Sequence, residues 1–180
     1  RLDRFDGLWL GGVLALILAL KLVVVDPLGG LHVDSPPGEA LPAQHPVEAN
    51  FGGKIELLGY DLPNRQVQRG ETFSLVLYWH ALTHLEENYQ TFVHVAQPLD
   101  TVQAQEDHLN PGGFPTTRWP LDKYVWDEYE IHVGPDTPPG EYSLNVGLYL
   151  RSEGHRLDRL DEDGRAVGDS LVIDVITVTE

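Results

Sequence analysis

The sequence predicts an all-β protein: an antiparallel β-sandwich of seven or eight strands, immunoglobulin-like or jelly-roll-like, preceded by one transmembrane α-helix. Three observations predict it. From residue 51 onward, apolar side chains recur at every second position, the period of a half-buried strand. Clusters of Gly, Pro, Asn and Asp separate these alternating runs, as turns separate antiparallel strands. Near the N-terminus, a long run of residues is almost entirely apolar.

The apolar run follows a short flank, residues 1–7, and extends from Leu8 to Val25. As a helix it would span roughly 27 Å at about 1.5 Å per residue, close to the hydrocarbon thickness of a bilayer, about 30 Å. Asp26 and Pro27 follow it, and a proline stops a helix. A cleaved signal peptide is disfavoured because no small-residue cleavage site follows the run. We therefore expect residues 8–25 to cross a membrane.

Charge and small residues predict the orientation and partners of this helix. Arg1 and Arg4 lie in the N-terminal flank, and the first basic residue after the run is Lys54. The positive-inside bias predicts a cytoplasmic N-terminus and a domain outside the cytoplasm, in the periplasm or at the cell surface. A stripe of small residues on one helix face would let another membrane helix approach, although such residues are common in membrane helices. The stripe comprises Gly11, Ala15 and Ala19. Membrane lipid and a membrane-protein partner are thus expected.

The remaining chain divides into a linker and the sandwich. Residues 26–50 are rich in Pro, Gly and small residues without a period, which predicts an extended extracytoplasmic linker. The sandwich is expected over residues 51–180. Alternation is clearest in Thr72–Ala81 and Glu141–Leu150. The other predicted strands are Lys54–Tyr60, Gln90–Ala96, Val102–Asp107, Tyr124–Val133, His155–Leu160 and Leu171–Val178.

Composition excludes several classes of function. The formal net charge is −16, which repels phosphate backbones, so nucleic acid is not an expected partner. The absence of Cys excludes disulfides, thiolate catalysis and Cys-ligated zinc. His80 and His84 end a strand rather than share a helix face, and Asp158–Gly164 does not fit a calcium loop. No nucleophile elbow, P-loop or dinucleotide fingerprint occurs. We expect no metal, no cofactor and no catalytic activity in this chain.

Short motifs follow one another between Leu58 and Arg156. They are Leu58-Gly59-Tyr60-Asp61, Gly70-Glu71, Leu77-Tyr78-Trp79, Phe92-Val93-His94-Val95, Ala104-Gln105, Asp107, Pro111, Pro115-Thr116-Thr117, Trp119, Asp127-Glu128-Tyr129, Gly140-Glu141-Tyr142 and Val146-Gly147-Leu148-Tyr149. This ordered set resembles the C-terminal extracytoplasmic β-sandwich of bacterial membrane glycosyltransferases of the polyprenyl-phosphate-mannose type. The membrane portion of those enzymes performs the transfer, and its catalytic loop is not matched here. The resemblance therefore implies an accessory, glycan-associated module.

Asp127 is the most unusual residue of the predicted strands. It falls on the apolar face of its strand, and a buried carboxylate must be paired or hydrogen-bonded. We expect His94 or Arg118 to be its partner, in a polar lock that pins the loop 110–119 to the sandwich. A sugar or ligand site is the alternative. The predicted lock residues are His94, Asp107, Arg118 and Asp127.

Three aromatic residues are candidates for contact with a glycan or partner: Trp119, Trp126 and Tyr149. Trp126 and Tyr149 point away from the predicted apolar faces, and only a clustered patch of such residues would indicate binding. Two functions follow. The first is a membrane-anchored, non-catalytic module that is glycan-associated or serves docking. The second is a single-pass accessory subunit of a larger membrane complex, such as an energy-transducing one.

Overall fold

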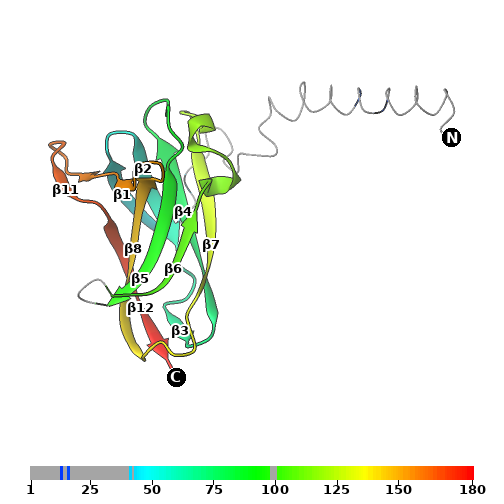
Figure 1. Ribbon diagram of the computed structural model, residues 1–180, viewed down its shortest axis with the longest axis vertical. Helices are drawn as coiled ribbons and strands as arrows, with labels where there is room; N and C mark the ends of the chain where they lie inside the picture. Colours follow the sequence, from blue (N-terminus) through cyan, green and yellow to red (C-terminus); the bar gives the residue numbers. More distant parts are fainter. Residues whose placement is uncertain (1–12, 14–15, 17–40, 42, 98–100) are drawn as a thin grey trace. The chain divides into compact units, whose positions relative to one another are not determined.

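The computed structural model describes residues 13, 16, 41, 43–97 and 101–180. The chain divides into two compact units, residues 1–34 and 35–180, and the second unit contains the β-domain (Figure 1). Of the predicted membrane helix, Val13 and Leu16 are described, and both are helical and exposed. Within the described residues, no helix has the length and apolar character needed to cross a bilayer. The rest of residues 8–25 lies outside the described part.

Strands dominate the domain, with two short 3₁₀ helices between β6 and β7. The strands are β1 (His45–Phe51), β2 (Ile55–Asp61), β3 (Gln66–Gln68), β4 (Thr72–Ala81), β5 (Gln90–Gln97), β6 (Thr101–His108), β7 (Tyr124–His132), β8 (Gly140–Leu150), β9 (His155–Arg156), β10 (Arg159–Leu160), β11 (Ala166–Gly168) and β12 (Leu171–Thr179). The 3₁₀ helices are η2 (Pro111–Gly113) and η3 (Thr116–Arg118).

The strands form two sheets that pack face to face (Figure 1). The first sheet has the order β11-β10-β1-β2-β4-β7, and the second has the order β3-β12-β8-β5-β6, with β9 paired to β8. The two sheets also meet along β6 and β7, where the backbone N–H of Glu130 donates to the carboxylate of Glu106 at 3.1 Å. The predicted all-β, two-sheet architecture is confirmed.

The core lies between the sheets and follows the predicted alternation. In β4, the side chains of Leu75, Leu77 and Trp79 have no exposed surface, and in β8 Leu144 and Leu148 are likewise fully buried. Each fully buried apolar side chain of this size contributes about 1.5–3 kcal/mol to folding. Because successive side chains of a strand point to opposite faces, the intervening side chains point to the outer face of each sheet.

Several strands differ from the sequence-based expectation. The single strand predicted over His155–Leu160 is two short strands, β9 in the second sheet and β10 in the first. β1 occupies residues 45–51, and residues 45–50 fall in the predicted linker. The Pro-rich composition does not indicate a strand there; the strand forms because it pairs with β2. β3 and β11 were not predicted, because runs this short carry no period. β3 pairs with β12 in parallel rather than antiparallel fashion, because the chain crosses from one sheet to the other after β2.

Candidate functional site

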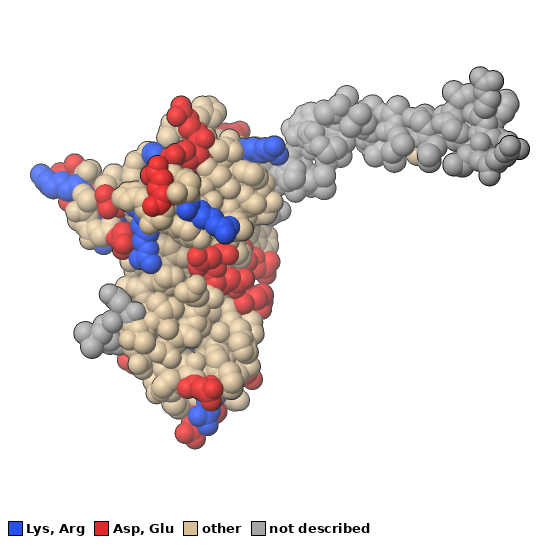
Figure 2. Space-filling view, in the orientation of Figure 1, with Lys and Arg blue, Asp and Glu red and all other residues tan. Residues whose placement is uncertain are grey.

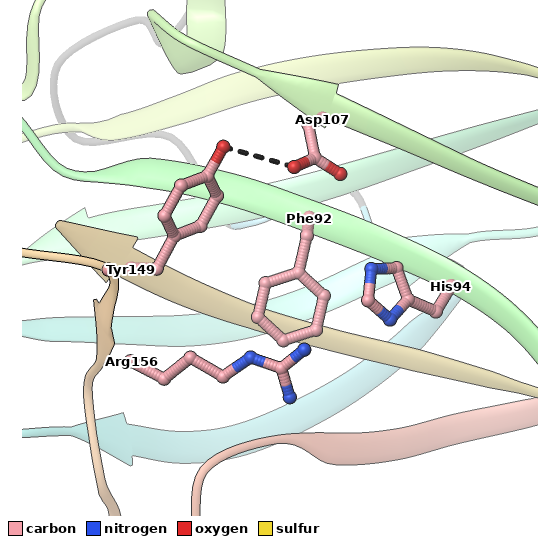
Figure 3. A pocket seen from close by; sticks show the side chains of 6 residues that line it. Phe92, His94, Asp107, Tyr149 and Arg156 are labelled. Carbon is pink, nitrogen blue, oxygen red and sulfur yellow. Dashed lines mark hydrogen bonds between the residues drawn. The ribbon is translucent and has the colours of Figure 1, made fainter. Parts of the chain in front are cut away.

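A small cavity opens on the outer face of the second sheet (Figure 3). Thr91, Val93 and Val95 of β5 point into the core, so Phe92 and His94 point outward. The neighbouring strands bring further side chains to this face. These are Asp107 from β6, Tyr149 from β8 and Arg156 from β9; with Gly154 they complete the lining of a cavity of about 160 Å³.

Phe92 forms the floor of the cavity. It lies opposite Gly147 of β8, and a Cβ at Gly147 would come within 2.5 Å of the ring and 2.9 Å of the Asp169 carbonyl oxygen. The glycine therefore leaves the space that the ring occupies. The Arg156 guanidinium lies 4.4 Å from the ring centroid, a cation–π distance. The imidazole of His94 is 4.6 Å from the same ring. Phe92 is consequently buried although it faces outward.

Four polar side chains surround this floor (Figure 3). The Tyr149 hydroxyl donates to the Asp107 carboxylate at 3.0 Å. Arg156 also contacts Asp169 at 3.4 Å, but both side chains are substantially exposed, and such a pair contributes little. The guanidinium thus keeps donors free to meet a ligand.

Burial and neighbouring charges determine the protonation of these groups. Burial, reinforced by the charge of Arg156, lowers the pKa of His94. The imidazole is therefore neutral at pH 7 and offers both a donor and an acceptor. Burial, together with the hydrogen bond to Asp107, raises the pKa of Tyr149, which keeps its phenol protonated. The cavity thereby combines an acceptor from Asp107, donors from Arg156 and groups that can serve in either role.

A second polar cluster is buried between the sheets at Asp127. The Asp127 side chain is 2 % exposed, as its place on the apolar face predicts. Its carboxylate accepts hydrogen bonds from Tyr129 Oη at 2.6 Å, from the Gly112 backbone N–H at 2.9 Å and from Thr91 Oγ1 at 3.2 Å. His108 Nδ1 lies 2.7 Å from Asp127 Oδ1, the carboxylate oxygen that also accepts from Gly112. The bond to Gly112 ties the loop 110–119 to β7.

The partners of Asp127 differ from those predicted. His108 takes the place expected for His94 or Arg118. His94 lies on the outer face of the second sheet, and Asp107 lies beside it in the cavity of Figure 3. Arg118 is exposed at the end of η3. The strand predicted over 102–107 ends one residue before His108, whereas β6 includes this histidine and carries it to the interface with β7.

His108 is held from three sides. Its ring stacks on Tyr129 with 4.0 Å between centroids and 5° between planes, and Nε2 lies 3.4 Å from a Glu106 carboxylate oxygen. Burial opposes protonation, but the hydrogen bond and charge of Asp127, aided by Glu106, outweigh it and raise the pKa of His108. The arrangement favours an imidazolium–carboxylate pair at the junction of the sheets.

The three predicted contact aromatics do not form one patch. Trp119, the C-cap residue of η3, is 4 % exposed, so its side chain is not at the surface as a contact residue would be. Trp126 is 40 % exposed on the outer face of the first sheet. Tyr149 lies on the outer face of the second sheet, on the other side of the molecule. Of the three, only Tyr149 lines the cavity.

The predicted helix-packing residues Gly11, Ala15 and Ala19 lie outside the described residues. In the described part of the chain, no group of three or more His, Asp or Glu side chains is placed to hold a metal ion.

No family model and no curated protein matches the chain. Among solved structures, it is similar to the crystal structure of a Niemann-Pick type C2 protein from Japanese carpenter ant, with 7% sequence identity and a TM-score of 0.38. The match covers 78% of this chain and 100% of that chain. A likeness this distant carries no argument about function.

Proposed function

We propose that the domain is a non-catalytic, glycan-associated module that binds a sugar in the cavity of Figure 3, and that the predicted membrane helix holds it outside the cytoplasm. The observation that carries the proposal is the convergence of an aromatic floor, Phe92, with four polar side chains of different hydrogen-bonding character. His94, Asp107, Tyr149 and Arg156 supply those groups.

The chemistry of the lining suits hydroxyl groups. Each sugar hydroxyl both donates and accepts, and the cavity offers a carboxylate acceptor, guanidinium donors, a neutral imidazole and a phenol within one small space. Pockets that bind small molecules combine apolar surface with a few polar groups that fix orientation. At about 160 Å³ the cavity is smaller than the roughly 300–1,000 Å³ of pockets for drug-sized ligands. It therefore suits one sugar unit.

The lining favours binding over hydrolysis. Glycoside hydrolysis ordinarily requires a pair of carboxyl groups about 5–9.5 Å apart on either side of the scissile bond. Asp107 is the single carboxylate among the residues that line the cavity, and the Tyr149 hydroxyl already donates to it. A carboxylate in this setting orients a ligand hydroxyl rather than acting as one of two catalytic groups.

The resemblance noted in the sequence supports the same site. Phe92, His94, Asp107 and Tyr149 belong to the motifs that carry it, and they come from three different strands. These four residues are separated by up to 57 positions in the sequence, yet all of them line one cavity. A resemblance that implies a glycan-associated module thus converges on a site whose chemistry suits a sugar.

The test uses the purified 180-residue chain in detergent. A glycan array identifies bound sugars, and calorimetry then measures affinities for the wild type and for Asp107→Asn and Tyr149→Phe. Each variant is expected to bind at least about tenfold more weakly, equivalent to about 1.4 kcal/mol. Trp126→Ala, on the outer face of the first sheet, is the matched control and should bind as the wild type does. Unaltered binding by both cavity variants, or no glycan retained on the array, would contradict the proposal.

A further inference from the structure

A second cavity lies where β5 begins and β8 ends. It has a volume of about 370 Å³ and is lined by Glu87, Asn88, Gln90, Leu150, Arg151 and Ser152. Gln90 of this cavity lies directly opposite Tyr149 of the first cavity in the β5–β8 pairing. The backbone N–H of Arg151 donates to the Gln90 side-chain oxygen at 2.8 Å. The linings of the two cavities are therefore neighbours in the second sheet, through the Gln90–Tyr149 pair.

The turn between β8 and β9 contributes to both cavities. Gly154 lines the first cavity, and Arg151 and Ser152 line the second. The Gly154 N–H donates to the Leu150 carbonyl at 2.9 Å and closes the turn. Arg151 is the first residue of this turn and follows Tyr149 of β8 by two positions in the sequence. One continuous ligand of modest length can therefore contact both residues.

Each cavity carries one cation and one carboxylate. The first holds Arg156 and Asp107, and the second holds Arg151 and Glu87. On the face shown in Figure 2, Lys and Arg are interspersed among Asp and Glu. Among the lining residues the charges therefore balance, and both cavities offer donors and acceptors. This balance favours an uncharged polyhydroxyl ligand over a polyanion, which the overall charge of −16 would also repel.

We infer that the two cavities are adjacent subsites of one groove, and that its ligand is an uncharged glycan of at least two sugar units. This inference rests on the proposed function and names the ligand class of that same site. One sugar unit occupies the cavity above Phe92, and the chain continues past Tyr149 toward Arg151 and Ser152. Arg151 is then a specificity-determining residue for ligand length, because it contacts the second unit alone.

The experiment compares ligands by length and charge. The probes are glucose, mannose and galactose, their di-, tri- and tetrasaccharides, and galacturonic-acid oligomers of the same lengths. Calorimetry with the full chain is expected to show at least a tenfold gain in affinity from a monosaccharide to the corresponding oligosaccharide. Arg151→Ala should remove most of that gain while changing monosaccharide affinity less than about twofold. Tyr149→Phe should weaken binding at every length. Arg165→Ala, in the exposed turn before β11, removes one cation away from both cavities and is the matched control.

The outcomes separate the inference from the proposed function. Equal affinity for mono- and tetrasaccharides overturns the inference and leaves the single-site function standing. Tighter binding of the galacturonic-acid oligomers overturns the uncharged ligand class. A length gain that survives both Arg151→Ala and Arg151→Gln removes the second cavity from the site. No binding of any saccharide overturns both proposals. Melting temperatures of all variants establish that each is folded.

Discussion

The carboxylate of Asp127 accepts hydrogen bonds from β5, from η2 and from its own strand, and it pairs with His108 of β6. Removing one partner of a buried pair leaves the other charge uncompensated, which typically costs about 3–5 kcal/mol. We therefore expect Asp127→Ala to lower the free energy of unfolding by about that amount, measured by chemical denaturation. The exposed neighbour Glu128→Ala should change stability by no more than about 0.5 kcal/mol. An Asp127→Ala domain as stable as the wild type would contradict this role.

The pairing of His108 makes stability depend on pH. Because the pKa of His108 is raised above 6.5 in the folded state, protonation stabilises the fold. This contribution is fully present below pH 6.5, the unfolded value, and is lost as the pH rises through the folded pKa. We expect the melting temperature of the wild type, relative to that of His108→Gln, to fall as the pH is raised from 6 to 8. The exposed His84→Gln should track the wild type throughout. A constant difference between wild type and His108→Gln would contradict the assignment.

The residues around Asp127 show where sequence reasoning succeeds and where it stops. Alternation along Tyr124–Val133 places Asp127 in the interior, because that inference needs only the period of one strand. Its partner lies 19 positions away on another sheet, and the choice among His94, Arg118 and His108 depends on the packing of the two sheets. Pairing of this kind is set by tertiary geometry, which a single sequence does not contain.

At the scale of elements, the conformation of η2 depends on Gly112, which packs closely against β7. Gly112 has φ +71°, and a Cβ there would overlap Val125 Cγ1, whereas Gly113 has φ +83° and open space around it. A left-handed backbone costs a non-glycine residue about 1–2 kcal/mol. We expect Gly113→Ala to cost that amount, and Gly112→Ala to cost clearly more because the methyl group also displaces β7 and the bond from Gly112 to Asp127. Denaturation curves of the two variants measure the difference; equal costs would contradict the close packing of η2 on β7.

Some strands can be predicted from the sequence and others cannot. β4 was predicted with its observed bounds, and β8 within one residue, because ten or eleven residues of alternation suffice to define a strand. β3 and β11 have three residues each, too few for any period. β1 lacks a clear apolar alternation and begins with His45 and Pro46, so its strand conformation follows from pairing with β2 and β10. For the site, the sequence identifies the motif residues of β5, β6 and β8. It does not contain the strand order β8-β5-β6, which brings these residues together on one outer face.

At the scale of the molecule, the charge of −16 predicts a response to salt. Like charges repel in the compact state, and raising the ionic strength from about 10 mM to about 150 mM shortens the Debye length from about 30 Å to about 8 Å. We expect the melting temperature to rise with NaCl over this range. Glu86→Gln with Glu162→Gln, both at exposed positions, should reduce the rise because they remove two negative charges. A melting temperature that falls with salt would mean that attractive ion pairs outweigh the repulsion.

The predicted membrane topology can be tested with the chemistry of the chain itself. The sequence contains no Cys, so a single introduced cysteine is a site-specific probe. Glu162→Cys lies in an exposed turn of the domain, and Asp3→Cys lies in the flank before the predicted helix. In intact cells stripped of any outer envelope, a membrane-impermeant maleimide should label Glu162→Cys and spare Asp3→Cys. Inside-out vesicles should give the reverse pattern.

A further variant tests whether the apolar run is what holds the chain in the membrane. Replacing Leu14 and Leu18 by Arg places two charges at the centre of the apolar run, each costing about 2.5–3.5 kcal/mol in a bilayer. Such a chain should no longer remain in the membrane after carbonate extraction, while the parent chain should stay. If the double variant is retained as well as the parent, lipid is not the solvent of residues 8–25. If Glu162→Cys reacts in inside-out vesicles, the domain lies on the cytoplasmic side and the predicted orientation is wrong. The site on the second sheet would then have to meet its glycan in another compartment, because a domain on the cytoplasmic side has no access to glycans outside the membrane.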